Sequence, residues 1–559
     1  MKQIADLHIH SRYSMATSKD GTPEMLDLWA RKKGITLLGT GDMTHPLWRQ
    51  ELKDKLIPVE PGLFRLKDEF VLPEAAHYPG KSPRFVLSGE ISSIYKKDGK
   101  TRKVHSLILL PGFREADAFA ARLEKIGNIH SDGRPILGLP CRDLLEIMLE
   151  ISEKGMYIPA HIWTPHFSLF GAKSGFDTIE ECFEELTPYI HALETGLSSD
   201  PVMNWQISAL DRYQLVSHSD AHSPSKLGRE ADLLDIELSY QGLFNAVQKG
   251  TGLEGTIEFF PEEGKYHYDG HRKCGVCLSP REAEKYNGIC PVCGKKLTMG
   301  VDHRILQLSD RDEGAAAMPE SGRPYESLVP LPEVISACVG FSTASKKVQG
   351  RYEMLLKKLG AEFSILREVP QEDIRTVGGE ALAEGIRRLR AGDVVRKPGF
   401  DGENMKEKIG IISDTHGLLR PEVLEILKDC KYILHAGDVN KDEILNVLRS
   451  MGNLYVVRGN NDKDWAENLR ISLNFTIGGV KFFMVHNKKD VTWDLDDTQV
   501  VIFGHTHKYF EKIIDDRLWL NPGSCGRSRF GGEVTMAVMT VEDGRYQVEK
   551  IILTENSEK

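Results

Sequence analysis

The sequence has no run of 18 apolar residues, and no short apolar stretch near its first residues resembles a secretory leader. We therefore expect a cytoplasmic protein with no membrane partner. Cysteine is scarce, at nine of 559 residues, and five of the nine are scattered singly, which argues against a disulfide framework. An excess of basic residues is also missing, since the formal net charge is −10. Charge alone thus gives no sign of a nucleic-acid partner, although an acidic total can hide a local basic groove.

Short apolar runs in residues 1–225 lead into polar residues that can bind metal ions. The runs at 35–38 and 156–160, for example, lead to Asp42 and His161. Helical stretches such as 23–33 lie between the runs. Buried parallel strands read as continuous apolar runs, and strands that alternate with helices form a parallel sheet or barrel whose site lies at their carboxyl ends. Seven such runs predict a barrel with metal ligands at its mouth. Any one of these histidines alone is better explained as a structural or surface residue. Nine residues that can bind metal, all placed in this way, favour a metal site.

His8 and His10 lie two residues apart in the first of these runs, so both imidazoles point to the same face of the strand. Imidazole and carboxylate ligands together suit Zn, Mn or Fe. Paired ions activate water and neutralise the charge of a phosphoester, so such a site needs no serine or cysteine nucleophile. Asp6 and Glu194 are expected to orient the ligands rather than bind metal themselves.

This pattern resembles the PHP (polymerase and histidinol phosphatase) superfamily over most of residues 1–225. The resemblance implies a distorted seven-stranded barrel with two or three divalent ions (Zn, Mn, Fe or Mg) and phosphoester hydrolysis. The nine ligands that it implies are His8, His10, Asp42, His45, Glu90, His105, His161, Asp220 and His222, and Asp42, Glu90 and Asp220 would be the catalytic residues. PHP proteins usually have adjacent Asp and His in the second motif, whereas two residues separate Asp42 from His45 here.

Four cysteines form two pairs, Cys274 with Cys277 and Cys290 with Cys293, and twelve residues separate the pairs. Four thiolates at this spacing indicate a closed structural zinc site, and redox chemistry is the alternative. A ribbon of this size depends on its metal to stay folded. The spacing does not tell whether the ribbon braces a domain or touches nucleic acid.

The barrel motifs, the cysteine ribbon and the Pro/Gly-rich segment 397–403 together resemble the endonuclease Q family, in which the second motif is also split. This resemblance spans residues 1 to about 403. It implies a DNA repair nuclease that cuts the strand 5′ to deaminated bases (uracil, hypoxanthine, xanthine) or abasic sites. The expected partner is DNA with such lesions, and repair or replication proteins are further expected partners.

Two segments near the predicted mouth are candidates for contact with DNA. Loop 163–176 directly follows a predicted ligand, so its aromatic residues can stack on a flipped base and its lysine can pair with phosphate. The basic segment 96–103 can meet phosphates. A packed lid and a solvated hairpin tip are the respective alternatives. The candidate contact residues are Phe167, Phe170, Lys173, Lys100 and Arg102.

A second set of apolar runs begins at residue 409 and leads into Asp-x-His, Gly-Asp, Gly-Asn-x-Asp and Gly-His-x-His motifs. This order resembles the calcineurin-like metallophosphoesterases. It implies an α/β sandwich with two divalent ions (Mn, Ni, Fe or Zn), bridged by Asp438, and it makes Asp438 and Asn460 catalytic. Asp414, His416 and His507 would hold one ion, and Asn460, His486 and His505 the other. Many relatives have His where this chain has Asn461, so we do not expect fast hydrolysis of poor leaving groups. A domain that binds without catalysis is the alternative.

The sequence thus predicts an α/β protein in four parts. These are a distorted seven-stranded (β/α) PHP barrel (1–255), a zinc ribbon (256–300), a basic helical extension and linker (301–404), and a separate α/β-sandwich metallophosphoesterase (405–559). The predicted function is a lesion-directed DNA endonuclease fused to a two-metal phosphodiesterase or phosphatase. The alternatives are a PHP phosphatase that acts on a small phosphate ester, and a DNA-binding scaffold with silent metal sites.

Overall fold

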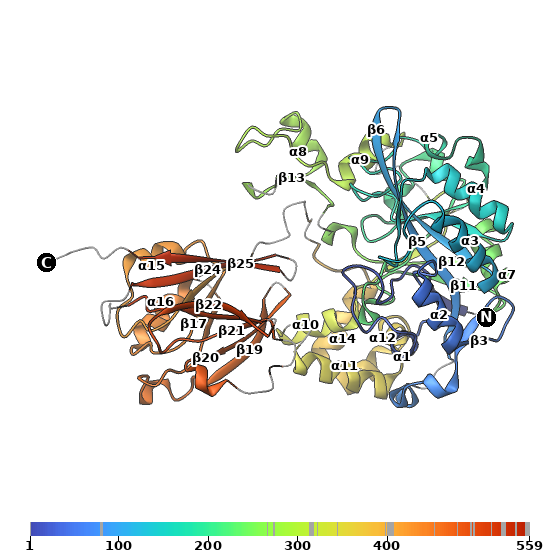
Figure 1. Ribbon diagram of the computed structural model, residues 1–559. Coiled ribbons are helices and arrows are strands. Elements are labelled where there is room, and N and C mark those ends of the chain that lie inside the picture. The colour runs from blue at the N-terminus through green and yellow to red at the C-terminus, as the bar shows by residue number, and fades with distance from the viewer. Residues whose placement is uncertain are drawn as a thin grey trace. The chain divides into compact units, whose positions relative to one another are not determined.

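A computed structural model of the chain divides into two compact units, residues 1–402 and 403–559 (Figure 1). It describes residues 2–553 except 79–81, 265, 272–273, 312–317, 321, 342, 344, 397–398, 400–406, 452, 478, 492–494, 496–497, 516, 527–532 and 543–544. The predicted Pro/Gly-rich boundary at 397–403 lies outside the described residues except for Gly399. Within the described part of the chain, every helix is too short or too polar to cross a membrane.

Seven strands of the first unit correspond to the seven apolar runs. They are β1 (Lys2–Asp6), β2 (Leu37–Gly39), β5 (Arg84–Lys97), β6 (Lys100–Leu110), β8 (Met156–Pro159), β9 (Ala192–Glu194) and β10 (Gln214–Val216). Strands β2, β8 and β9 are buried along their whole length. In β2, Leu37 packs into one apolar cluster and its neighbour Leu38 into another. Two-sided burial explains why the runs are continuous rather than alternating.

The helix predicted at 23–33 is confirmed as α1 (Pro23–Lys33). The Thr22 side chain accepts a hydrogen bond from the Met25 amide, Pro23 occupies the first turn, and Gly34 ends the helix at φ 87°. The other main helices of this region are α2 (Pro46–Lys55), α3 (Phe113–Glu124), α4 (Cys141–Ile151), α5 (Ile179–Phe183), α6 (Pro201–Asn204) and α7 (Tyr240–Lys249).

Strands β5 and β6 depart from the parallel arrangement that the runs predict. They form a long antiparallel hairpin, which projects from the first unit in Figure 1. Asp98 and Gly99 form its tip with φ of 52° and 73°, the left-handed backbone that a two-residue hairpin turn requires. Strand β5 therefore runs past the predicted end of its apolar run, and Glu90 lies within it rather than beyond it.

The seven strands follow one another in space in their sequence order. The β1–β2, β2–β5 and β9–β10 pairs are parallel, and the β5–β6 and β6–β8 pairs are antiparallel. Beyond β8 the Ile162 amide donates to the Glu194 carbonyl (3.1 Å), and beyond β10 the His10 amide donates to the Ala221 carbonyl (2.9 Å). These bonds bring the ends of β8, β9, β10 and β1 together, so the residues that follow these strands face a common centre. Further strands are β3 (Leu56–Pro58), β4 (Phe64–Leu66), β7 (Ile136–Leu137), β11 (Ala231–Asp235), β12 (Leu253–Glu258) and β15 (Tyr325–Ser327).

The cysteine module and a helical extension complete the first unit. The module contains β13 (Asp269–His271), β14 (Val276–Leu278) and α8 (Pro280–Lys285), and α9 (Val301–Leu308) follows it. The extension consists of α10 (Leu331–Val339), α11 (Lys346–Leu359), α12 (Glu362–Arg367), α13 (Gln371–Gly378) and α14 (Glu380–Arg390). A buried ion pair between Lys33 of α1 and Glu362 of α12 (2.8 Å) attaches the extension to the barrel helices.

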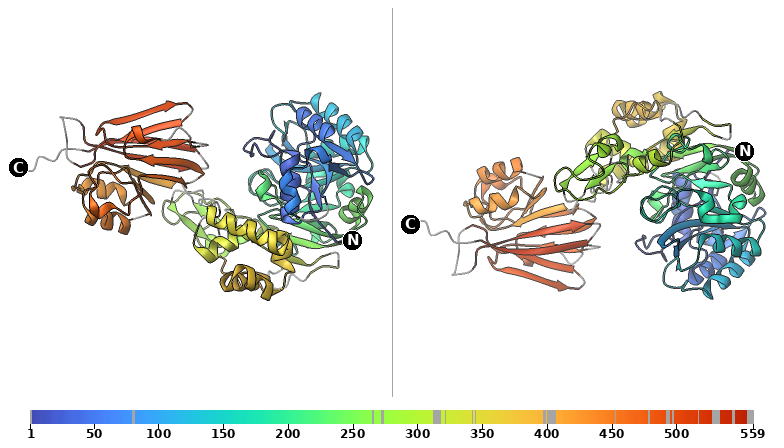
Figure 2. Two further views of the ribbon diagram at one scale, coloured as in Figure 1. Left: turned by 90° about the horizontal axis from the view of Figure 1, so that it is seen from below. Right: turned by 90° about the horizontal axis from the view of Figure 1, so that it is seen from above.

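The second unit has two five-stranded sheets and helices on one side, which Figure 2 shows in layers. The first sheet contains β18 (Asn453–Val456), β17 (Tyr432–His435), β16 (Glu407–Ile412), β24 (Thr535–Glu542) and β25 (Arg545–Ile552). The second contains β19 (Ser472–Ile477), β20 (Val480–Val485), β21 (Val500–Ile502), β23 (Arg517–Pro522) and β22 (Tyr509–Ile514). Leu434 packs between the sheets, while Ile433 packs with α15 (Pro421–Leu427) and α16 (Asp442–Met451). This unit is an α/β sandwich, as the sequence predicts.

Candidate metal centres

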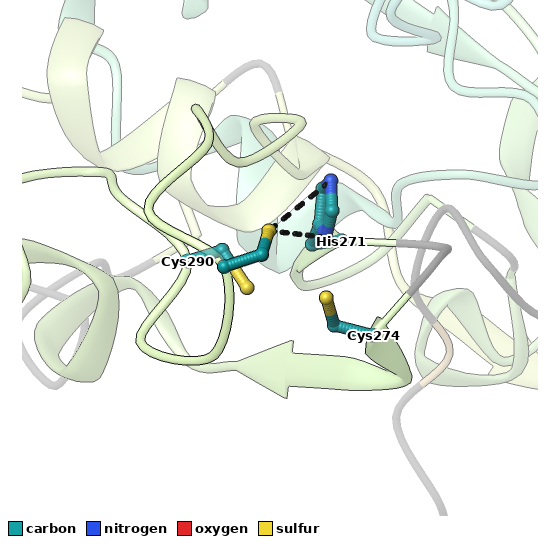
Figure 3. Close-up of side chains that lie close together, drawn as sticks. His271, Cys274 and Cys290 are labelled. Atoms are coloured by element: carbon teal, nitrogen blue, oxygen red, sulfur yellow. Dashed lines mark hydrogen bonds between the residues drawn. The ribbon is translucent and has the colours of Figure 1, made fainter.

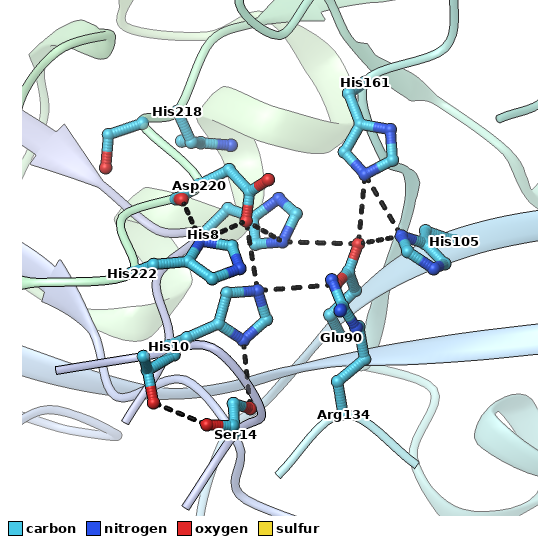
Figure 4. Close-up of polar contacts among 12 residues, drawn as sticks. His8, His10, Ser14, Glu90, His105, Arg134, His161, His218, Asp220 and His222 are labelled. Carbon is cyan, nitrogen blue, oxygen red and sulfur yellow. Dashed lines mark hydrogen bonds and ion pairs between the residues drawn. The ribbon is translucent and has the colours of Figure 1, made fainter. Parts of the chain in front are cut away.

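Two groups of side chains that could hold a metal ion share Glu90 in the first unit (Figure 4). His8, His10, Glu90 and Asp220 form one group, and Glu90, His105 and His161 form the other. Glu90 Oε1 lies 2.7 Å from His105 Nδ1 and 3.1 Å from His161 Nε2, and its Oε2 lies 3.4 Å from His10 Nε2. Burial raises the pKa of Glu90, but His105 and His8 outweigh burial and hold that pKa well below its usual range. The carboxylate is therefore charged at the centre of the cluster.

The ligand atoms of the first group lie close together, and several of them have no hydrogen-bond partner among the described residues. His8 Nε2, His10 Nε2 and Asp220 Oδ1 are buried and lack hydrogen-bond partners among the described residues, although His10 Nε2 and Asp220 Oδ1 are 3.0 Å apart. Buried polar atoms are seldom left in this state unless they bind something else. A mixed imidazole and carboxylate set suits Zn, Mn or Fe, so the residues fit a divalent ion. Bound ions would neutralise phosphate charge and activate water.

Carboxylates outside the cluster orient its histidines. His8 Nδ1 donates to Glu194 (3.0 Å), which leaves Nε2 facing the centre, and Glu194 Oε2 also accepts from the His161 amide (2.8 Å). His218 lies between Glu194 (2.7 Å) and Asp232 (3.2 Å). Burial lowers the pKa of His218, but these carboxylates raise it to about 10. His218 was not predicted, although it stands two residues before a predicted ligand.

Asp6 and Asp42 also act through neighbours. Asp6 accepts from the Ser219 amide (3.1 Å) and the Gly228 amide (2.8 Å), and so holds the segment that carries Asp220. Asp42 Oδ1 accepts from His10 Nδ1 (3.0 Å), while its Oδ2 accepts from Ser11 and Ser14. Asp42 was predicted as a ligand and a catalytic residue. In the structure Asp42 lies outside both ligand groups, and its Oδ1 holds the ring of His10 through Nδ1.

His45 and His222 also differ from the ligand prediction. His45 Nδ1 accepts from the Trp48 amide (3.5 Å) at the start of α2, and its Nε2 contacts the His130 carbonyl (2.9 Å) in the segment between α3 and β7, so both ring nitrogens already have partners. His222 Nδ1 contacts the Asp220 carbonyl (2.8 Å), and its ring lies 4.6 Å from the ring of His10. His222 faces the cavity beside the cluster without joining either group.

A cavity of about 770 Å³ opens beside the cluster. Its walls include His105, His161, His166, Phe167, Asp220, His222, Arg134, Arg229, Phe259 and Tyr266. Phe167 lies at φ 59°, and its ring centre is 4.8 Å from that of His105. Of the predicted contact residues, Phe167 is therefore the one that lines the mouth.

Two other predicted contact residues are buried. Phe170 is 3% exposed and packs on Trp163, with 4.9 Å between the ring centres. Arg102 is 8% exposed, donates to the Gly175 carbonyl and stacks over Phe176 at 4.1 Å. These two side chains pack within the protein, which favours the packed-lid alternative for Phe170 and leaves neither of them facing the cavity. Lys100 and Lys173 are exposed, as phosphate contact requires.

Three of the four predicted cysteine ligands come together with a histidine (Figure 3). His271, Cys274, Cys290 and Cys293 place ligand atoms within 4.8 Å of one another, which suits a tetrahedral site. Cys277 lies in β14 outside this group. His271 was not predicted, because it belongs to neither of the two cysteine pairs.

Replacing Cys290 with serine is expected to remove one metal ion per chain and to expose the cysteine module to proteolysis. Cys290 is buried in a small apolar cluster with Ala283 and Leu297, too small to hold the module without metal. Elemental analysis and limited proteolysis measure both effects, with Cys338→Ser as the matched control. His271→Ala should also lose the ion. Loss in Cys277→Ser but not in His271→Ala would instead support the four-cysteine set.

The second unit brings its predicted ligands together in two groups. Asp414, His416 and His507 form one group, and Asp414, Asp438 and His486 form the other. Asp438 Oδ2 lies 3.4 Å from His486 and 3.9 Å from His416, so it stands between the groups, as a bridging ligand must. Asn460 Oδ1 lies 3.0 Å from His486 Nε2 and 2.8 Å from His505 Nδ1. The buried Asp414 Oδ1 has no hydrogen-bond partner among the described residues, so this set also fits a metal site.

Asp462 and Asn461 fix the position of Asp438. Asp462 accepts from the backbone amides of Asp438 (3.0 Å) and Asn440 (2.8 Å), and Asn461 donates twice to the Asp438 carboxylate. Asn461 therefore contacts the predicted bridging ligand. Asp462 is the last residue of the Gly-Asn-x-Asp motif, and the motif alone gives no sign of this role.

Comparison with known proteins identifies relatives of both units. The family model of the calcineurin-like phosphoesterase superfamily domain matches residues 408–544, and that of the MJ0043 C-terminal domain matches residues 330–393. The chain is 30% identical over 427 residues to the uncharacterized protein YqxK of Bacillus subtilis, which covers 73% of this chain and all of that protein. It is 31% identical over 267 residues to the uncharacterized protein MJ0043 of Methanocaldococcus jannaschii, of which it spans 33%.

Solved structures agree with the predicted resemblance. The lesion-specific endonuclease PfuEndoQ from Pyrococcus furiosus is 30% identical with a TM-score of 0.63, and the match covers 72% of this chain and 94% of that one. Endonuclease Q in complex with a 27-mer duplex substrate bearing an abasic lesion matches at 30% identity and a TM-score of 0.62, over 72% of this chain and 95% of that one. The chain therefore belongs to the endonuclease Q family and carries, from residue 408, a calcineurin-like phosphoesterase domain.

Proposed function

We propose that the first unit is a metal-dependent endonuclease that cuts DNA 5′ to deaminated bases or abasic sites. The observation that carries the proposal is the pair of ligand groups around Glu90, which opens onto a cavity of about 770 Å³. Two adjacent divalent ions suit hydrolysis of a phosphodiester. The endonuclease Q relative bound to a duplex with an abasic lesion supports DNA as the substrate class.

The finer organisation belongs to the same proposal. The seven strands would form a PHP barrel within residues 1–255, with a structural zinc ribbon at 256–300 and a basic helical extension at 301–404. Two or three ions (Zn, Mn, Fe or Mg) would occupy the barrel site. His105 and His161 would share Glu90 with His8, His10 and Asp220, and His222 would act from the cavity wall.

Cleavage of a DNA panel tests the proposal. Duplexes with one uracil, hypoxanthine, abasic site or no lesion are incubated with the full chain and Mn²⁺ or Mg²⁺. Incision 5′ to the lesion, and none of the undamaged duplex, is expected. Turnover of small phosphate monoesters without DNA cleavage would favour the PHP phosphatase alternative. If His8→Ala and Asp220→Ala leave every measured function intact, the scaffold alternative holds.

Replacing Phe167 with alanine is expected to lower cleavage at uracil by roughly tenfold, because stacking of a base on an aromatic ring contributes about 1–3 kcal/mol. Phe167 lines the cavity next to His105. Single-turnover cleavage rates measure the effect, with Tyr189→Ala, an exposed aromatic elsewhere on this unit, as the control. Equal rates for Phe167→Ala and the wild type would remove this residue from lesion recognition.

We further propose that the second unit is a two-metal phosphodiesterase or phosphatase (Mn, Ni, Fe or Zn). Its ligand arrangement around Asp414 and Asp438 supports the proposal. The fusion suggests that it processes ends or products left by the nuclease. Incubation of the nicked DNA with the full chain and a nuclease-inactive variant tests this link, which fails if the ends stay unchanged while an unrelated nucleotide is hydrolysed.

A further inference from the structure

Arg134 is a charged residue of the metal cavity that belongs to no recognised motif. It lies between α3 and β7 and lines the cavity together with His105 and His161. Its Nη1 is 3.2 Å from Glu90 Oε2, and Figure 4 shows its side chain beside Glu90. The side chain is 25% exposed, so it reaches both the buried cluster and the open cavity.

The backbone around Arg134 is anchored on both sides. The Gly133 amide donates to the Tyr13 carbonyl (2.9 Å), and the Ser92 amide donates to the Pro135 carbonyl (3.0 Å). The Arg134 amide itself donates to Asp132 Oδ1 (3.1 Å). A Cβ atom at Gly133 would lie 2.3 Å from Asp42 Oδ2, so only glycine allows this close approach to the cluster. The backbone that carries the Arg134 side chain is therefore held in place beside the ligands. A group held in this way can stabilise charge without reorganisation.

Most of the donors of Arg134 are available to a ligand. A guanidinium carries five N–H donors, and Glu90 is the one side-chain partner of Arg134 among the described residues. Glu90 also faces histidines of both ligand groups, so its oxygens are the ones that metal ions would take. A planar guanidinium beside a metal cluster then matches a phosphate oxyanion in charge and geometry.

We propose that Arg134 is a catalytic residue that donates hydrogen bonds to a non-bridging oxygen of the scissile phosphate. This inference rests on the proposed endonuclease function. In the hydrolysis, a water oxygen bonds to phosphorus, one P–O ester bond breaks, and the protons of the water pass to the leaving oxygen and to solvent. Arg134 gives up no proton. It stabilises the negative charge that gathers on the phosphoryl oxygens.

A purely positional role is the alternative, in which Arg134 only holds Glu90 for the metal. The two roles predict different effects of an Arg134 substitution on the metal content. A positioning residue would lower metal content and activity together, whereas a phosphate-binding residue would lower the rate with the metals in place. They differ also in their response to a neutral phosphate, which offers the guanidinium no charge.

The test compares Arg134→Ala and Arg134→Lys with the wild type, and Arg122→Ala is the control, since Arg122 forms an exposed pair with Glu150 and belongs neither to the ligand groups nor to the cavity walls. Arg134→Ala should lower the single-turnover cleavage rate about a hundredfold, as loss of one transition-state donor does. Arg134→Lys should retain part of the rate, because it keeps the charge but not the fork. Metal content by elemental analysis should equal that of the wild type.

A binding measurement gives a second readout. DNA with an uncharged methylphosphonate at the target linkage should bind the wild-type holoenzyme more weakly than normal DNA. The weakening should be smaller for Arg134→Ala, in which only the metal ions still sense the lost phosphate charge. A rate for Arg134→Ala within threefold of the wild type, a loss of metal, or equal weakening in both proteins would overturn the inference. If the wild type cleaves none of the lesion duplexes, the proposed endonuclease function itself has failed.

Discussion

Replacing Glu90 with glutamine is expected to lower cleavage of lesion-containing DNA about a thousandfold, the upper end of the loss seen when one fixed charge-stabilising group is removed. Glu90 is the shared member of both ligand groups. Glutamine keeps the shape but loses the negative charge that the surrounding histidines and a divalent ion require. The measurements are the single-turnover rate on uracil DNA and the metal content.

Glu150→Gln is the matched control for this variant, because Glu150 forms an exposed pair with Arg122 on the first unit. Thermal unfolding of both variants separates a chemical defect from a folding defect. The metal content of Glu90→Gln should fall by at least one ion per chain. Normal metal content together with a normal cleavage rate would show that Glu90 is not at the catalytic centre.

The short strands that lead to the ligands were predictable because several of them, such as β2, β8 and β9, are buried on both faces. Such strands must be apolar along their whole length, and this produces runs that stand out without any knowledge of their neighbours. The polar residue after each run is equally visible. His161 and Asp220, which follow β8 and β10, therefore lie close to their predicted places.

The positions that were missed depend on partners far away in the sequence. Nothing near His45 shows that the His130 carbonyl will contact its ring, and nothing near Arg102 shows that it will stack on Phe176. Phe170 has an aromatic side chain that could stack on a base, but Trp163 packs against it in the folded loop. Residue type and spacing predict which groups can do chemistry, whereas tertiary contacts decide which of them face the cavity.

Arg134 could not be predicted for a related reason. It has no motif, and its role in the cavity follows only from the long β5–β6 hairpin, which places Glu90 within a strand rather than at its end. The apolar run at 85–87 gives no sign that the strand continues to Lys97, because the later part of β5 mixes polar with apolar residues and ends in charged ones. The hairpin tip Asp98–Gly99 was the available signal.

Replacing Asp438 with asparagine is expected to lower hydrolysis of a chromogenic phosphodiester about a thousandfold while cleavage of lesion DNA stays unchanged. Asp438 stands between the two ligand groups of the second unit, and asparagine removes the charge that a bridging ligand supplies. The second unit has its own cores between its sheets and beneath its helices, so the substitution should not disturb the first unit.

The control for this variant is Asp429→Asn, which changes an exposed residue of the same unit. The two activities are assayed on the same preparations, together with metal content. If lesion cleavage fell in parallel with phosphodiester hydrolysis, the two centres would not be independent, and if neither fell, the second unit would be a binding domain rather than an enzyme.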